Sequence, residues 1–331
     1  MTAIVADLQA PAAAEQPKRW RMVRTMVRKK VAMAALAVIV VFYAAGIFAP
    51  VIVAVTPLPG PNEQPRPLTI ELRNAGPSSD HLLGTDALGR DLLSRILYAA
   101  RTTILFTFVV VVTGGLFIGL GLGLLAGYRG GWIDTLIMRI GEVLAGVPTL
   151  ILMLAITAAF RSRITQFSFD LGDNTFLSTE DARAAVQFLI LVGASVPFAW
   201  VGSSRIVRSV VLSIREQAYV QAAESMGAST RRILFRHVLP GVMPLWVVGV
   251  SGGMGAIAMA EVSLSFLGLG ITPPTASFGT LISDGAGPLT FKNNPHLLLA
   301  PAIPVILFYL AWNLLGDALV DILEPRSTTH R

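Results

Sequence analysis

The hydrophobic positions of this chain gather into six long runs that are separated by shorter polar segments. Each run is close to the ~20 apolar residues that an α-helix needs to cross the hydrocarbon core of a bilayer. The pattern therefore predicts an all-α membrane protein with six transmembrane helices. The predicted helices cover residues 31–54, 102–127, 134–160, 186–204, 241–265 and 297–318.

Within the second run, glycine recurs at every fourth position. Residues four apart share one face of a helix, and small residues let two helix backbones approach closely, which is how helices associate in lipid. We therefore predict that this glycine stripe packs against another helix. It consists of Gly115, Gly119, Gly123 and Gly127.

The segment just before the second run has a helical pattern of its own. Between Thr85 and Leu97, leucine and isoleucine recur at helical spacing, and arginine, aspartate and serine fill the opposite face. Thr85 or Asp86 can cap the first turn. We expect an amphipathic helix that lies at the membrane interface and leads into the second transmembrane helix.

A polar, basic segment at 205–240 separates the fourth run from the fifth. One face of a helix in this segment is formed by Tyr219, Ala222, Ala223 and Met226. Two small residues at the centre of that face leave room for a partner to dock. Gly227 is expected to end this helix, and a second short basic helix is expected over residues 230–236. Such a pair either transmits force to the membrane helices or only anchors the topology by its charge.

The composition supports the membrane class. The chain has 331 residues, of which 53% are hydrophobic and 14% charged, whereas an ordinary soluble domain carries about 25% charged residues. Its mean hydropathy is +0.66. The net charge of +6 comes from basic residues at the ends of the apolar runs, so the positive-inside rule explains it better than nucleic-acid binding does.

The same rule sets the orientation of the chain. If the N-terminus lies in the cytoplasm, 17 lysines and arginines fall on the inner side and 9 on the outer side, which accounts for all 26. We therefore predict that both termini and the 205–240 segment are cytoplasmic.

The chain carries no recognisable apparatus for hydrolysing ATP. A phosphate-binding loop needs a lysine that follows a glycine, and none of the four lysines does. The four histidines have no metal-binding spacing, cysteine is absent, and no serine-hydrolase elbow is present. We therefore expect no enzyme activity, no metal and no cofactor bound by this chain, and an energy source on another protein.

Three acidic residues within or beside the predicted spans are candidates for the transport path or its gate. Glu142 lies three residues after Arg139, and an ion pair between them is the preferred interpretation. Glu261 lies near the outer end of the fifth run, where it faces either a substrate path or a partner outside the membrane. Asp317 lies near the inner end of the sixth run. If these residues relayed ions, the chain would be a self-sufficient channel or ion-coupled transporter.

The 205–240 segment resembles the EAA signature of permease subunits of ABC importers. That signature runs Glu-Ala-Ala, three residues, Gly, nine residues, Ile, one residue, Leu-Pro. The matching residues here are Gln221-Ala222-Ala223, Gly227 and His237-Val238-Leu239-Pro240. Gln221 stands in place of the first glutamate. His237 stands in place of the isoleucine, and an Arg-His-Val-Leu-Pro ending resembles the peptide and nickel branch of the family.

Three further stretches resemble the same branch: Gly-Thr-Asp-x-x-Gly-Arg-Asp at 84–91, the stretch at 261–274, and the C-terminal stretch at 313–326. The resemblance covers about residues 20–326. It is closest to the C-type permease of dipeptide and oligopeptide importers. It implies the type I ABC importer permease fold in the cell inner membrane, surrounded by lipid.

The resemblance also implies partners. A homologous second permease would complete a pseudo-twofold heterodimer, two cytosolic ATPase subunits would bind ATP and Mg, and an extracytoplasmic binding protein would deliver the substrate. The 205–240 segment then holds the coupling helices. The implied docking residues are Glu216, Tyr219, Ala222, Ala223, Gly227, Arg231 and Arg232.

On this interpretation the chain has four parts: a basic cytoplasmic tail at 1–30, the first transmembrane helix and an extracytoplasmic segment at 31–100, a core permease domain at 101–320, and a cytoplasmic tail at 321–331. The expected function is to form half of a path for dipeptides or oligopeptides. Importers of nickel chelates or oligosaccharides share the same signatures, so these substrates stay open as alternatives.

Overall fold

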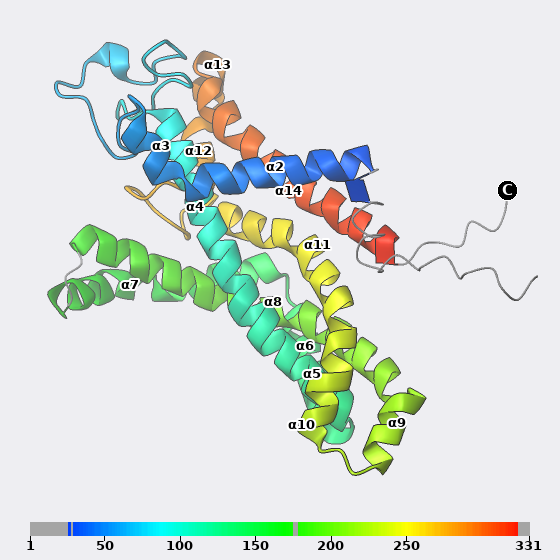
Figure 1. Ribbon diagram of the computed structural model, residues 1–331. Coiled ribbons are helices and arrows are strands. Elements are labelled where there is room, and N and C mark those ends of the chain that lie inside the picture. The colour runs from blue at the N-terminus through cyan, green and yellow to red at the C-terminus, as the bar shows by residue number, and fades with distance from the viewer. Residues whose placement is uncertain (1–25, 28, 175–177, 324–331) are drawn as a thin grey trace, which may run out of the picture.

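The computed structural model describes residues 26–27, 29–174 and 178–323, so most of the two predicted tails lies outside the described part. The described chain is a bundle of long helices, with shorter helices at its two ends (Figure 1). The elements in chain order are α2 (Lys30–Ile47), α3 (Ala49–Val55), the 3-10 helix η2 (Ile70–Leu72), α4 (Leu92–Val110), the π-helix η3 (Val111–Leu120), α5 (Gly121–Arg129), α6 (Gly131–Ala145), α7 (Thr149–Asn174), α8 (Thr179–Arg215), α9 (Ala218–Ser225), α10 (Thr230–Ile233), the π-helix η4 (Leu234–Val238), α11 (Leu239–Phe266), α12 (Phe278–Gly285), α13 (Pro288–Asn293) and α14 (His296–Leu323).

Among the described residues, five helical stretches are long and apolar enough to cross a membrane. They are Lys30–Ile47, Leu92–Arg129, Asp181–Arg215, Thr230–Phe266 and His296–Ile322. These stretches contain most or all of the predicted first, second, fourth, fifth and sixth helices. The second, fourth and fifth begin or end about ten residues beyond the predicted bounds, and the sixth extends only slightly beyond them.

The third predicted helix, at 134–160, is not a single rod. It is divided between α6 and α7, which meet at a bend of 85°. Gly146 caps the end of α6, and Pro148 precedes the start of α7. A proline disfavours helical backbone at the residue before it, so Val147 interrupts the helix. If the bent pair counts as one crossing, the described chain has up to six spans.

The predicted interfacial helix starting at Thr85 or Asp86 is wrong. Helix α4 begins only at Leu92, and the Asp91 carboxylate caps it by accepting a hydrogen bond from the Ser94 amide at 2.8 Å. Asp86 instead closes a turn, because its carboxylate accepts hydrogen bonds from the backbone amides of Leu88 and Arg90. The polar side chains that the amphipathic pattern assigns to water are buried: Arg90, Asp91, Ser94 and Arg95.

Buried pairing explains why the three charged side chains among them, Arg90, Asp91 and Arg95, leave the water. The Arg90 guanidinium donates to the Asp86 carboxylate at 2.7 Å, and His81 contacts the Asp91 carboxylate at 2.8 Å. Arg95 donates from Nη1 to the Pro61 carbonyl at 3.1 Å. These contacts therefore hold the loop before α4 in place, because a buried charge is tolerated only when it is paired and hydrogen-bonded.

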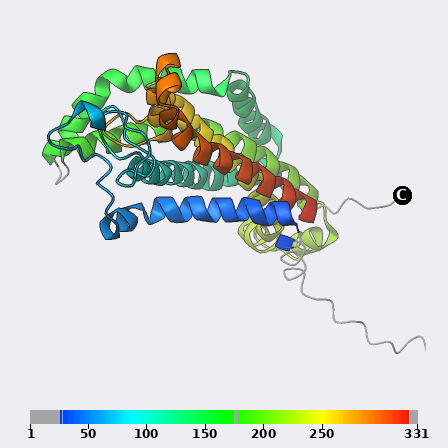
Figure 2. The same ribbon diagram turned by 90° about the horizontal axis from the view of Figure 1, so that it is seen from above.

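Helices α2 and α14 lie side by side, as Figure 2 shows. Phe42 stacks on Phe308 with ring centroids 4.1 Å apart, and both rings are buried. At the other end of α2, the Lys29 ammonium lies 2.8 Å from the Asp321 carboxylate. The start of α2 and the end of α14 therefore lie at the same end of the bundle.

Helix α8 packs against the glycines of the second transmembrane stretch. A Cβ atom added to three of these glycines would lie only 2.6–2.7 Å from a Cβ atom of α8, closer than real Cβ atoms approach. The pairs are Gly119 with Ser203, Gly123 with Val207, and Gly127 with Val211. The two helices can therefore approach this closely only because glycine has no Cβ atom at these three positions.

Gly115 departs from the predicted stripe. A Cβ atom there would meet only Val111 of its own helix, at 4.0 Å, whereas a Cβ on Gly114 would lie 2.7 Å from Ala199 of α8. The reason is the π-helix η3, which has more residues per turn than an α-helix and shifts the contact face by one residue. The Gly115 carbonyl still takes part, since it accepts a hydrogen bond from the Ser203 hydroxyl at 2.8 Å.

Candidate functional site

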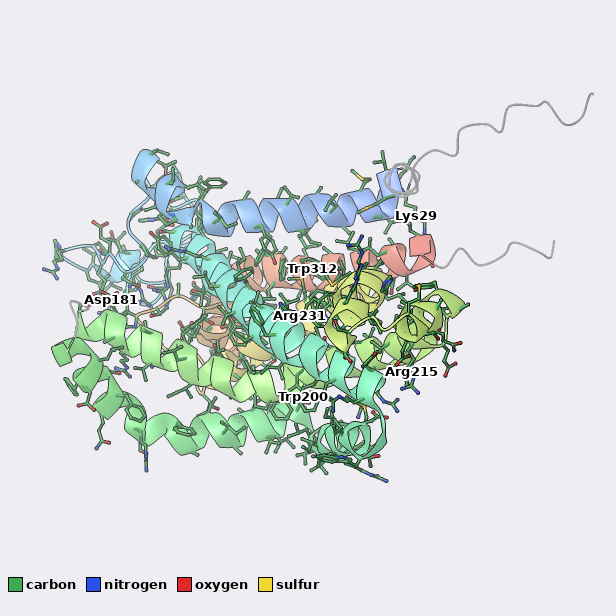
Figure 3. All side chains as sticks on the ribbon, turned by 60° about the horizontal axis from the view of Figure 1, so that its bottom comes forward. Lys29, Asp181, Trp200, Arg215, Arg231 and Trp312 are labelled. Atoms are coloured by element: carbon green, nitrogen blue, oxygen red, sulfur yellow. The ribbon has the colours of Figure 1, made fainter. Side chains whose placement is uncertain are left out.

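Two short helices, α9 and α10, carry the chain from the end of α8 to the start of α11. Where α8 ends, Arg215 Nη1 donates to the carbonyls of Gly127 and Tyr128 at 3.2 and 3.5 Å. These carbonyls end α5, and the end of a helix has unpaired acceptors and a partial negative charge that a guanidinium satisfies. The contact ties α8 to α5 directly beside the start of α9. Lys29 and Arg215 lie toward the same end of the molecule in Figure 3, with Asp181 at the opposite end of α8.

One face of α9 is anchored to the long helices. Val220 and Ala223 are only 1% and 7% exposed. Val220 belongs to a buried cluster with Val207 and Val211 of α8 and with Ile233 of α10. Burial of this face fixes α9 to the ends of the membrane helices, so a displacement of α9 must also move them.

The predicted docking face of α9 is therefore split. Tyr219 and Met226 are 52% and 81% exposed, and Ala222 is exposed beside them. Ala223, which the pattern places on the same face, points into its own chain. The sequence period alone did not separate these positions, because Ala223 lies at the edge of the face, next to the buried side of the helix that carries Val220.

Gly227 ends α9 in a left-handed conformation with φ of 77°. Its amide donates to the Glu224 carbonyl at 2.9 Å, and the Ala228 amide donates to the Ala223 carbonyl at 3.1 Å. This pair of hydrogen bonds is the Schellman motif, in which glycine is preferred because a Cβ atom is strained at positive φ. The Ser229 side chain then caps α10 by accepting from the Arg232 amide.

The predicted second basic helix begins at Thr230 but does not end at Arg236. It continues through η4 into α11 as a single stretch to Phe266. Pro240 does not interrupt this stretch, since the π-helix η4 widens the turn directly before the proline ring.

The exposed surface of the segment combines apolar and charged side chains. Phe235 is 62% exposed and lines a hollow of about 570 Å³. The other residues that line this hollow are Ser229, Arg231, Arg232 and Arg236. The ring of His237 lies 6.1 Å from that of Tyr219, so the residue that departs from the general signature supports the exposed tyrosine. Gln221 is exposed, and its amide donates to the Glu216 carbonyl at 3.3 Å. Glu216 itself is also exposed.

The three acidic candidates lie in three separate surroundings. The predicted ion pair of Glu142 with Arg139 is confirmed at 2.9 Å, with both side chains more than half exposed. Asp317 is exposed on α14. Glu261 is fully buried and accepts hydrogen bonds at 2.9 Å from three hydroxyls, those of Thr103, Ser265 and Ser277. Its carboxylate therefore joins α4, α11 and the start of α12 and faces no open space.

Sequence reasoning missed two contacts that connect the helices. The Ser203 hydroxyl accepts a hydrogen bond from the Trp246 indole at 2.7 Å while it donates to Gly115, so it links three helices. Arg208 of α8 holds the Asp134 carboxylate of α6 through two hydrogen bonds. The sequence offered one signal for the first contact, since Ser203 is a polar residue on the face of α8 that packs against the glycines.

Comparisons with known proteins agree with this arrangement. Residues 119–329 match the family described as binding-protein-dependent transport system inner membrane component, and residues 18–77 match the N-terminal TM domain of oligopeptide transport permease C. The chain is 38% identical over 253 residues to the glutathione transport system permease protein GsiD of Pectobacterium atrosepticum, covering 76% of this chain and 75% of that protein.

Two further relatives cover as much or more of the chain. The oligopeptide transport system permease protein OppC of Mycobacterium bovis is 36% identical over 77% of this chain and 79% of its own length. The dipeptide transport system permease protein DppC of Bacillus subtilis is 34% identical over 97% of this chain and 88% of its own length. The chain therefore belongs to the family of binding-protein-dependent transport system inner membrane components.

Proposed function

We propose that this chain is a permease subunit of an ATP-driven ABC importer and forms half of a translocation path for dipeptides or oligopeptides. The peptide substrate comes from the names of the relatives, which are permeases of oligopeptide, dipeptide and glutathione transport systems. The observation that carries the coupling role is α9, with one face buried against the membrane helices and the other exposed.

In this mechanism, the ATPase subunits bind ATP and Mg, and the chain itself performs no catalysis. An ATPase subunit binds the exposed residues Glu216, Tyr219 and Ala222 and the end of α9 at Gly227. Arg231 and Arg232 add charge contacts. Ala223 contributes from the inner face, where it holds α9 to its own chain. Movement of α9 passes to α8 through Val220 and to α5 through Arg215.

The remaining partners follow from the same proposal. A second, homologous permease completes a pseudo-twofold heterodimer, and an extracytoplasmic binding protein docks on the opposite end. Both termini lie in the cytoplasm, which agrees with the Lys29–Asp321 contact at one end of the bundle. Six spans, with α6 and α7 as one bent crossing, would complete the type I fold.

The coupling role is tested with the double variant Tyr219→Ala, Met226→Ala. Both side chains are more than half exposed, so the fold should be unaffected, while less ATPase should co-purify and uptake should fall. The control is Leu289→Ala on α13, which removes an apolar side chain that is 76% exposed on the opposite end. If the double variant co-purified with ATPase and supported uptake like the control, the coupling role would be refuted.

Uptake experiments also separate the alternative functions. Peptide accumulation by the whole complex is expected to require ATP. Uptake by this chain alone in liposomes, driven by an ion gradient, would instead indicate an ion-coupled transporter. Accumulation of a nickel chelate or an oligosaccharide in place of peptides would change the substrate and leave the architecture as proposed.

A further inference from the structure

Two adjoining hollows form one groove that runs along α8 and α11 and is bordered by residues of α4, η3 and α7. The larger has a volume of about 450 Å³ and the smaller about 220 Å³, and both are lined by Phe198, Ala199 and Ile257. On α11 the lining runs from Gly249 to Ser263, a rise of about 21 Å at 1.5 Å per residue. The groove thus follows about two thirds of the ~30 Å hydrocarbon core.

None of the described residues that line the groove is charged. The acidic candidates Glu142, Glu261 and Asp317 all lie elsewhere. The lining consists of apolar side chains, glycines and the hydroxyls of Thr149, Ser195, Ser203 and Ser263. A charged group that entered would lose its water without gaining a counter-ion, which is costly in a membrane interior.

Two glycines of the groove serve to keep it open. A Cβ atom added to Gly202 of α8 or Gly253 of α11 would meet no described atom within 4 Å. They differ from Gly119 and Gly123, where the same atom would strike α8. Since glycine weakens a helix and no neighbour requires it here, its effect at these two positions is to leave space.

The groove also offers acceptors to an incoming ligand. The Ser195 hydroxyl donates to the Leu191 carbonyl at 2.8 Å, and the Ser263 hydroxyl donates to the Met259 carbonyl at 2.7 Å. Each oxygen keeps a lone pair that can accept a hydrogen bond. Met153 and Met259 add flexible apolar side chains, which suit a surface that binds ligands of varying shape.

We propose that this groove is a substrate subsite that takes the uncharged side chains and backbone amides of an extended peptide during translocation. An acyl chain has no N–H to donate, and the backbone amides of a transmembrane helix are already bonded within the helix. An extended peptide brings free amides to the hydroxyls and apolar side chains to the rest of the lining. The inference rests on the peptide function proposed above and specifies which peptides this half of the path favours.

The test uses the complete transporter in proteoliposomes, with ATP inside and the binding protein and labelled Leu-Leu-Leu outside. Gly253→Leu and Ala256→Phe place bulk in the groove, because Gly253 has open space beside it and Ala256 is exposed. Ala159→Phe, an exposed position on α7 outside the lining, is the matched control.

We expect both groove variants to lose peptide accumulation while subunit assembly and ATP hydrolysis stimulated by the binding protein stay at the level of the control. Loss of assembly would overturn the proposal and indicate that a helix of the second permease fills the groove. Unchanged accumulation would also overturn it and indicate lipid. If the wild-type transporter accumulated no peptide at all, the proposed peptide function itself would fail, which is a distinct outcome.

A second measurement locates the peptide directly. A tripeptide that carries a photoreactive leucine is cross-linked during turnover, and the labelled residues are mapped by mass spectrometry. Label is expected on the groove residues, which lie at 195–206 of α8, 249–263 of α11, 149–153 of α7 and 110–115 of α4 and η3. Label confined to other helices would contradict the assignment even if the bulky variants block uptake.

Discussion

Replacing Gly123 by alanine should separate two helices that the structure holds in contact. The added Cβ atom would lie 2.6 Å from Val207 Cβ and 2.8 Å from the Ser204 carbonyl oxygen. Neither atom belongs to the free end of a flexible side chain, so the clash is relieved only if α5 and α8 move apart by about 1 Å. That movement also stretches the contact between Arg215 and the Gly127 carbonyl, which is already 3.2 Å long.

The size of the effect follows from two opposing contributions. Overpacking of a close contact costs about 1–3 kcal/mol. Alanine favours the helix over glycine by about 0.5–1 kcal/mol. Gly121→Ala brings the same gain in helix stability but no clash with α8, because no described atom lies within 4 Å of the added Cβ atom. The gain in helix stability is therefore the same in the two variants and cancels when they are compared. The free energy of unfolding of Gly123→Ala should be lower than that of Gly121→Ala by about 1–3 kcal/mol.

The measurement is equilibrium unfolding of the purified permease in mixed micelles with increasing dodecyl sulfate, followed by tryptophan fluorescence. Gly121→Ala is expected to match or exceed the wild type, and Gly123→Ala to unfold earlier. Equal midpoints for the two variants would show that close approach to α8 does not depend on Gly123. Replacing Gly119 and Gly123 together by leucine should further lower the yield of assembled transporter.

Three other substitutions test single contacts. Gly227→Val should uncouple uptake from ATP hydrolysis or block assembly, because a β-branched residue is strained at φ of 77°. Asparagine tolerates that conformation better, so Gly227→Asn should retain more uptake. Equal uptake by the two variants would argue that the left-handed backbone at residue 227 is not needed. Glu261→Leu leaves three buried hydroxyls without their acceptor and should lower the unfolding free energy by about 3 kcal/mol or more in the same assay. Thr103→Val removes only one donor and should lower it by about 1 kcal/mol. Similar losses for the two variants would mean that Glu261 does not hold the three hydroxyls together. Arg139→Ala should change the unfolding free energy by less than about 1 kcal/mol, because its ion pair with Glu142 is exposed, and a larger loss would indicate a further partner.

The positions of the long helices and the turn at Gly227 follow from the sequence because their causes are local. Apolar runs of spanning length and a glycine at a helix end each determine structure within a few residues. The bend between α6 and α7 also has a local cause, at Gly146 and Pro148, but the apolar pattern continues through it.

Other features depend on partners that are distant in the chain. Arg95 appears on the polar face of its helix, yet it is buried because the Pro61 carbonyl and the Asn62 side chain reach it. Ala223 is buried although the helical period of α9 groups it with the exposed Tyr219 and Ala222. Gly114 replaces Gly115 at the contact with α8 because a π-helix changes the phase, and periodicity assumes a uniform helix.

Helix α8 also contains Pro197, which lacks the amide that would bond to the preceding turn. The missing hydrogen bond makes Pro197 a point at which the helix can bend, and the part after it runs to Arg215 over about 27 Å at 1.5 Å per residue. A swing of about 10° about this joint would displace Arg215 by about 5 Å. The groove residues of α8 extend from Ser195, before the proline, to Ile206, after it. If α9 transmits movement as proposed above, the same swing would leave Ser195 nearly in place and displace Ile206 by about 2 Å, so the width of the groove would change mainly towards Ile206.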